Sequence, residues 1–161
     1  MNNIKEYKQL GAYGIVIKNN KILLIKKHGG PYDGKLDLPG GTIEFNEKPS
    51  HALIREFKEE VGIDITKYKL FDADSVSFNW LFKDNTINVF HTGIFYEVLE
   101  YKGEINKKII IDNQNDDSLG AEFYTIKDIK KSQLSMIAIM ELEKLGYEKI
   151  RLFQNLSIKS T

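Results

Sequence analysis

Three glutamates, Glu56, Glu59 and Glu60, lie three and four residues apart in a segment that reads REFKEEVG. Side chains at these offsets share one face of an α-helix, within an arc of about 100°. Because like charges at this spacing destabilise a helix by about 0.2 to 0.5 kcal/mol per pair, the cluster calls for a counter-charge. Hard carboxylate oxygens suit Mg²⁺ or Mn²⁺, with water and phosphate oxygens completing the ligand set. A plain solvated helix face is the alternative, and the surrounding residues decide between the two.

The residues around the glutamates predict a capped helix beside a glycine turn. Asn46 is placed to cap this helix, and Gly62 to end it in the left-handed conformation. An apolar stripe beside the acidic arc predicts docking on a sheet, and it comprises Leu53, Ile54, Phe57 and Val61. The preceding residues 36–41 read LDLPGG, a turn in which backbone atoms can approach a ligand where a Cβ would obstruct. We therefore expect the turn and the acidic helix to line one cleft.

Residues 41–63 resemble the signature of the Nudix hydrolases. That signature is a glycine, five residues, Glu, seven residues, Arg-Glu, an aliphatic, any residue, Glu-Glu, any residue, Gly and an aliphatic. Every polar and glycine position matches, and Phe57 stands where the family more often has a branched aliphatic residue. The resemblance implies one Nudix hydrolase domain over residues 1–161. It also implies the α/β class, as an α/β/α sandwich around a central mixed β-sheet.

The resemblance further implies an activity: Mg²⁺-dependent hydrolysis, with Mn²⁺ as a substitute, of a diphosphate linkage in a nucleoside diphosphate linked to another moiety. The implied metal ligands are Glu56, Glu59, Glu60 and the backbone carbonyl of Gly40. Arg55 would orient the carboxylates and can reach Glu59 one turn on. Glu56 is the expected base for the attacking water, with a later loop acid as the alternative. A silent nucleotide-binding or sensing domain is the alternative function, and the intact glutamates argue against it.

Further candidates lie outside the three glutamates, and the expected substrate contacts are Lys27, Gly41, Glu47 and Asp117. Two roles are open for Glu47. It supports or is linked to the metal site, or its negative charge is simply favourable near the helix N-terminus. Residues 28–35 form either a rim that contacts phosphates through Lys27, His28 or Lys35, or a plain surface connection. The resemblance makes three acids candidates for an extra metal ligand or base, namely Asp116, Asp117 and Glu122; solvated loop acids are the alternative.

The remaining pattern predicts strands at 12–17, 21–26, 75–82, 86–99 and 122–126, with turns at 18–20 and 83–85. A helix is expected from residue 132 to a stop at Gly146. Phe78, Trp80 and Tyr96 could stack on a nucleobase, although their positions in the strands favour core packing. His91 is either a ligand or, as its place in a strand favours, a satisfied strand histidine.

Composition limits the remaining classes of function. The 161 residues, 42% hydrophobic and 29% charged, fit one soluble globular domain. Lys plus Arg equals Asp plus Glu at 23 each, so charge gives no broad attraction to nucleic acid or membrane. The absence of cysteine excludes disulfides and thiol catalysis. No signal peptide or membrane span is recognisable, so a cytoplasmic location is expected. Which nucleotide is the substrate stays open, as does a homodimer.

Overall fold

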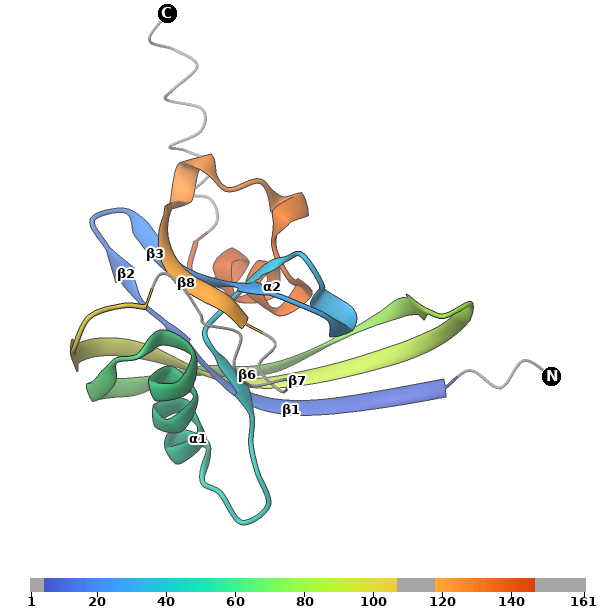
Figure 1. The fold of residues 1–161 in the computed structure, drawn as a ribbon, viewed down its shortest axis with the longest axis horizontal. Helices are drawn as coiled ribbons and strands as arrows, with labels where there is room; N and C mark the ends of the chain where they lie inside the picture. Colours follow the sequence, from blue (N-terminus) through green and yellow to red (C-terminus); the bar gives the residue numbers. More distant parts are fainter. Residues whose placement is uncertain (1–4, 107–117, 147–161) are drawn as a thin grey trace, which may run out of the picture.

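The chain forms eight strands and two α-helices within residues 5–106 and 118–146, the part that the computed structural model describes (Figure 1). The strands are β1 (Lys5–Ile15), β2 (Ile17–Lys18), β3 (Lys21–Lys27), β4 (Leu36–Asp37), β5 (Gly40–Thr42), β6 (Asp64–Phe82), β7 (Asn85–Lys102) and β8 (Ser118–Thr125). The helices are α1 (Pro49–Glu56) and α2 (Met136–Lys144). Shorter turns are the 3-10 segments η1 (Gly30–Tyr32), η3 (Ile126–Asp128) and η4 (Lys131–Gln133), and the π-helical turn η2 (Phe57–Val61).

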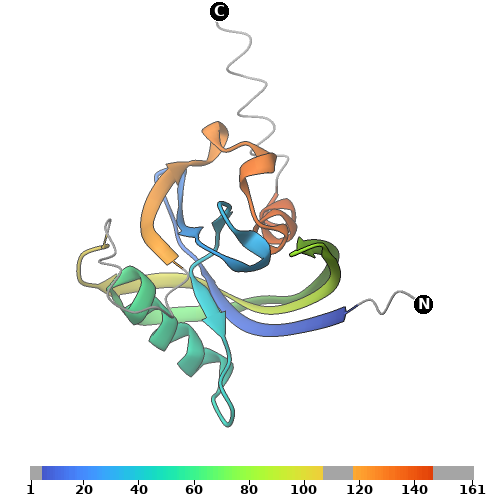
Figure 2. The same ribbon diagram turned by 45° about the vertical axis from the view of Figure 1, so that its right-hand side comes forward.

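A mixed sheet with strand order β5-β1-β7-β6 forms the centre of the molecule. In it β1 runs parallel to β7, while β5 and β6 pair antiparallel with their neighbours. A second, antiparallel sheet consists of β2, β3 and β4, with β8 paired to β3. Helix α1 lies on one side of the long strands and α2 on the other (Figures 1 and 2). The predicted α/β sandwich with a central mixed sheet is confirmed, and the small second sheet is an addition to it.

Two hydrophobic cores fill the space on either side of the strands, because successive side chains of a strand point to opposite faces. On β3, Leu23 and Ile25 pack with Phe57 in the core beneath α1. The alternate residues Ile22 and Leu24 belong to the core that α2 covers. All five side chains are fully buried. The acidic helix is therefore fixed to the sheet by its apolar side.

Several strands extend further than the sequence pattern predicted. β1 begins at Lys5, since its polar first half pairs in register with β7 from Ile87 onward. β6 begins at Asp64 and pairs along its whole length with β7. Both predicted hairpin turns are present as two-residue turns with positive φ, at residues 19–20 and 83–84.

The predicted cap of α1 is wrong. The helix begins at Pro49 after an extended Lys48, and Asn46 lies in the preceding turn with φ 62°. Proline suits the first helical position because its missing N–H would have no intrahelical partner there. The predicted stop is confirmed, since Gly62 adopts φ 80° and donates its N–H to the carbonyl of Phe57.

The C-terminal helix begins later than predicted. Ser135 caps α2 by accepting a hydrogen bond from the Ala138 N–H at 3.1 Å. Leu134 lies outside the helix and forms an isolated bridge with Leu36. Among the residues described, no helix combines the length and apolar character that crossing a bilayer requires.

Candidate active site

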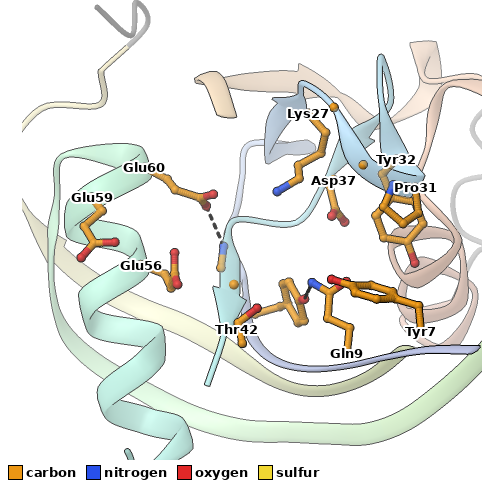
Figure 3. A pocket seen from close by; sticks show the side chains of 15 residues that line it. Tyr7, Gln9, Lys27, Pro31, Tyr32, Asp37, Thr42, Glu56, Glu59 and Glu60 are labelled. Carbon is orange, nitrogen blue, oxygen red and sulfur yellow. Dashed lines mark hydrogen bonds between the residues drawn. The ribbon is translucent and has the colours of Figure 1, made fainter. Parts of the chain in front are cut away.

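The three glutamates of the sequence motif line one cavity of about 570 Å³ (Figure 3). Glu56 ends α1, and Glu59 and Glu60 follow in the π-helical turn η2. Their exposure differs, because Glu60 is 5% exposed while the side chain of Glu59 is 58% exposed. The opposite part of the cavity is formed by Tyr7, Gln9, Lys27, Tyr32 and Asp37. The cavity thus has an acidic side on the helix and a side of mixed polarity on the two sheets.

The glycine turn lies directly against the acidic helix, as expected. Gly40 has φ 139°, and a Cβ there would collide with the backbone oxygen of Ala12. A Cβ on Gly41 would lie 2.6 Å from the carboxyl carbon of Glu56. The Gly40 N–H donates to Glu60 Oε2 at 3.0 Å. Gly40 is therefore required by close backbone packing, a Cβ on Gly41 would displace the Glu56 carboxylate, and the turn holds Glu60 through a backbone hydrogen bond.

Arg55 holds the carboxylates around it in fixed positions. Its Nε and Nη2 donate to the two oxygens of Glu47 at 2.8 and 3.0 Å. Its Nη1 donates to Glu56 Oε1 at 2.8 Å and to Glu59 Oε2 at 3.3 Å. Nη2 also donates to the Thr42 carbonyl at 3.0 Å. Paired N–H groups match a carboxylate in geometry as well as charge, so Arg55 joins the turn before α1 to the acidic face.

The two carboxylates nearest Arg55 have different pKa shifts. Hydrogen bonds from Arg55 lower the pKa of Glu47 to about 2. Burial raises the pKa of Glu56, although Arg55 and Lys27 both act in the opposite direction. The pKa of Glu56 is raised although Arg55 lies beside it, so the negative charge of this carboxylate is not fully compensated. A bound cation would supply that compensation.

The donor set fits a hard divalent cation in its chemistry, because the carboxylates and the Gly40–Gly41 backbone border the same cavity. Within residues 5–106 and 118–146, however, no three acidic or histidine side chains are gathered closely enough to hold a metal ion. Arg55 and the Gly40 N–H already take oxygens of Glu56, Glu59 and Glu60. Each of these bonds uses one oxygen of a carboxylate, which has about four acceptor sites, so metal binding would require the three side chains to come closer together while keeping their present hydrogen-bond partners.

Of the expected substrate contacts, Lys27 and Gly41 line the cavity. Glu47 is not among its lining residues and instead pairs with Arg55, with its Oε2 also accepting the Glu44 N–H. Glu122 is exposed on β8, opposite Leu24 of β3. Asp116 and Asp117 lie outside the described residues.

The rim candidates separate into two groups. Gly29, Gly30, Pro31 and Tyr32 line the cavity from the loop between β3 and β4. His28 is exposed near Asp33, and Lys35 donates to the Ser132 carbonyl at 2.6 Å and lines a second, smaller cavity.

The three aromatic residues considered for stacking on a nucleobase lie in different parts of the fold, and none of them lines the cavity. Phe78 stacks on Tyr32 with ring centres 5.3 Å apart and packs against the core under α2. Tyr96 is buried against Tyr68 in the other core. Trp80 contacts Phe82 and does not line the cavity.

Five residues of the opposite wall were not named as contacts from the sequence, namely Tyr7, Gln9, Tyr13, Tyr32 and Asp37, although Tyr32 lies in the predicted rim 28–35 and Asp37 in the predicted turn 36–41. Three of them stand at odd positions of β1, so one face of that strand supplies them. Asp37 is 2% exposed and its Oδ1 accepts hydrogen bonds from the Leu38 N–H and the Ser135 hydroxyl. Residues 5–11 read KEYKQLG, without a period-two alternation of apolar residues, so no sequence pattern marked the first half of β1 as a strand.

The NUDIX domain model matches residues 8–141 of this chain. The chain belongs to the Nudix family. Among curated relatives, an ADP-ribose pyrophosphatase of Methanocaldococcus jannaschii is 50% identical over 50 residues, which are 31% of this chain and 30% of that protein. An 8-oxo-dGTP diphosphatase of Proteus vulgaris is 35% identical over 102 residues, which are 60% of this chain and 81% of that protein. By class this chain is a Nudix hydrolase, an enzyme acting on phosphoric anhydride bonds.

Solved structures agree on the fold. A MutT NUDIX hydrolase of Burkholderia pseudomallei superposes with a TM-score of 0.65 at 22% identity, over 85% of this chain and 97% of that one. A MutT protein of Methanosarcina mazei gives a TM-score of 0.62 at 16% identity, over 91% and 99% of the two chains. At these identities the likeness concerns the Nudix fold alone.

Proposed function

We propose that this Nudix hydrolase cleaves a diphosphate linkage in a nucleoside diphosphate joined to another moiety, with Mg²⁺ as cofactor and Mn²⁺ as a substitute. The observation that carries the proposal is the shared cavity, in which Glu56, Glu59 and Glu60 face the Gly40–Gly41 turn and Lys27. Carboxylates next to a backbone turn and a lysine suit a ligand that brings both phosphates and a divalent cation.

Each residue of the acidic side has a proposed task. Glu56, Glu59, Glu60 and the Gly40 carbonyl would hold the metal, which would neutralise phosphate charge and help to activate water. Glu56 accepts the proton of the attacking water, because a carboxylate with a raised pKa is the better base. Arg55 keeps Glu56 and Glu59 in place through the hydrogen bonds of its Nη1. Lys27 and Gly41 border the space for substrate phosphates.

A nucleotide panel with Mg²⁺ or Mn²⁺ tests this function. The names of the relatives supply its first members, which are ADP-ribose, 8-oxo-dGTP and DHNTP. We expect metal-dependent turnover that EDTA abolishes. Product masses after reaction in ¹⁸O-labelled water identify the phosphorus that is attacked. Binding without turnover across the panel would contradict the proposal and favour a silent nucleotide-binding domain.

A further inference from the structure

His91 is a fully buried histidine between two tyrosines that line the cavity. Its Nε2 lies 2.6 Å from the hydroxyl oxygen of Tyr13, on β1. Its Nδ1 lies 2.9 Å from the hydroxyl oxygen of Tyr32, in η1 of the loop between β3 and β4. A single imidazole on β7 therefore connects the neighbouring strand of the central sheet to the rim of the cavity.

Ring packing also holds these side chains in place. The ring of Tyr32 stacks on His91 at 5.6 Å and on Phe78 at 5.3 Å between ring centres. The ring of Tyr13 meets His91 edge-on at 5.4 Å and stacks on Phe95 at 5.8 Å. Because each tyrosine has a ring contact besides His91, removing the histidine hydrogen bonds alone would change the hydroxyl positions more than the ring positions.

The protonation state of His91 limits which group donates in each of its two hydrogen bonds. Burial lowers the pKa of His91 to about 4, so the ring is neutral at pH 7, with one N–H and one lone pair. One tyrosine must then donate its hydroxyl proton to the ring, and the other must accept the ring N–H. The accepting tyrosine keeps its own proton for an acceptor outside the pair, because the further contacts of these hydroxyls are donors. Gln9 Nε2 donates to the Tyr13 oxygen at 3.4 Å, and the backbone of Ile137 hydrogen-bonds the Tyr32 oxygen. Burial raises the pKa of Tyr13 and Tyr32, so both hydroxyls stay protonated.

We propose that His91 is a positioning residue for substrate binding, which fixes Tyr32 at the rim and orients one tyrosine hydroxyl proton toward an acceptor atom of the bound substrate. This inference rests on the proposed function. The acceptor belongs to the group carried by the phosphates, because Tyr32 lies across the cavity from Glu56 and Glu59 (Figure 3). The buried carboxylate of Asp37 acts on both tyrosines electrostatically, so an uncharged acceptor such as a carbonyl oxygen or ring nitrogen suits the position better than an anion.

His91→Phe and His91→Gln are the matched variants for this proposal. Phenylalanine fills the space of the ring without hydrogen bonds, whereas glutamine retains one donor and one acceptor. We expect His91→Phe to raise KM about tenfold, with kcat within about threefold, because a substrate hydrogen bond made by an uncharged donor is lost. His91→Gln should recover most of the affinity. A KM unchanged in His91→Phe, or a kcat that falls with KM unchanged, would overturn the proposal.

Tyr32→Phe provides a second measurement, at the rim and with its ring contacts retained. Its effect on KM should not add to that of His91→Phe if both act through one hydroxyl network, and full additivity would contradict the proposal. If His91→Phe does not fold, Tyr32→Phe and His91→Gln carry the test alone: Tyr32→Phe must raise KM while His91→Gln stays near the wild type. Isothermal titration calorimetry with the α,β-methylene analogues of dGTP and ADP compares the affinities of the wild type and the same variants without turnover. An absence of wild-type turnover would refute the proposed function, and the calorimetric comparison would then decide the role of His91: equal affinities in the wild type and His91→Phe would overturn it.

Discussion

In the part of the chain that the structure describes, two places gather carboxylates around a single cationic side chain, and they lie on opposite helical layers. The Arg55 cluster consists of Arg55, Glu47, Glu56 and Glu59. The Lys144 cluster consists of Lys144, Asp72, Asp74 and Glu141. Each has one positive and three acidic side chains, yet only the Arg55 cluster borders the large cavity among the described residues.

The clusters differ in how their negative charge is compensated. Arg55 offers three nitrogens, and its pairing with Glu47 uses both carboxylate oxygens. Lys144 offers one nitrogen, and Glu141 Oε2 is buried with no hydrogen-bond partner among the described residues. A planar guanidinium can order several carboxylates at once, whereas an ammonium acts as a point charge. Under the proposed function, we expect the Arg55 cluster to present carboxylates to a ligand and the Lys144 cluster to affect stability alone.

The largest difference between the clusters should appear in turnover when Glu56 is neutralised. Glu56→Gln should lower kcat by about 10³-fold, because it removes both the proposed base and a metal ligand while keeping the side-chain size. Steady-state kinetics with Mg²⁺ and the best substrate of the panel measure this. Circular dichroism should report an unchanged fold, and a kcat within tenfold of the wild type would contradict the role of Glu56.

The next largest effect should be a pH-dependent stability from Glu141. Burial raises its pKa from 4.5 to about 7, so its contribution is fully present below pH 4.5 and is lost as the pH rises through 7. This difference corresponds to on the order of 3 kcal/mol. Glu141→Gln should therefore be more stable than the wild type at pH 8, with the gain vanishing near pH 4.5, in urea unfolding series. The matched control is Glu143→Gln, which changes an exposed residue of the same helix; an equal gain in both variants would refute the burial explanation.

Arg55→Lys should separate charge from geometry in the cavity cluster. Lysine retains the charge but cannot hold Glu47 and Glu56 together, so we expect kcat/KM to fall by about 10- to 100-fold. Lys144→Arg, which keeps the charge of the other cluster, should leave kcat/KM unchanged. Equal kinetic losses in the two variants would end the functional distinction between the clusters.

The smallest effect is expected for Asp72→Asn. Asp72 lines neither cavity and pairs with Lys144, which lowers its pKa. Turnover should stay within about twofold of the wild type, since the residue contacts nothing at the proposed site. A kinetic loss comparable to that of Arg55→Lys would show coupling between the two helical layers.

Local sequence rules predicted much of the acidic side of the site. The glutamates, Arg55 and the stop at Gly62 lie within one helix and its next turn, so fixed periodicity sets their positions. The cap at Asn46 was wrong because Pro49 fixes the helix start after an extended Lys48. The π-helical turn η2 was not foreseen either, since its π-type hydrogen bonding, as in the bond from the Gly62 N–H to the Phe57 carbonyl, has no simple sequence signal.

The opposite wall could not be predicted in the same way. Tyr13, Tyr32 and His91 come from three separate segments, and their hydrogen bonds join residues 59 and 78 positions apart. The Lys144 cluster likewise joins residues 70 and 72 positions apart. Pairing of β1 with β7 brings Tyr13 near His91, and its register depends on the whole sheet. Tyr32 lies in η1 and Lys144 in α2, so the packing of a loop and a helix against the sheets brings them to their partners.

The sequence by itself determined the family, the acidic helix and the glycine turn, because spacing along one chain segment fixes which side chains share a helix face. Only the tertiary structure decided what faces that helix across the cavity, and that Arg55 donates hydrogen bonds to two of its three carboxylates. The physical reason is that helix periodicity is local, whereas burial and the pairing of charges depend on segments brought together by the sheets.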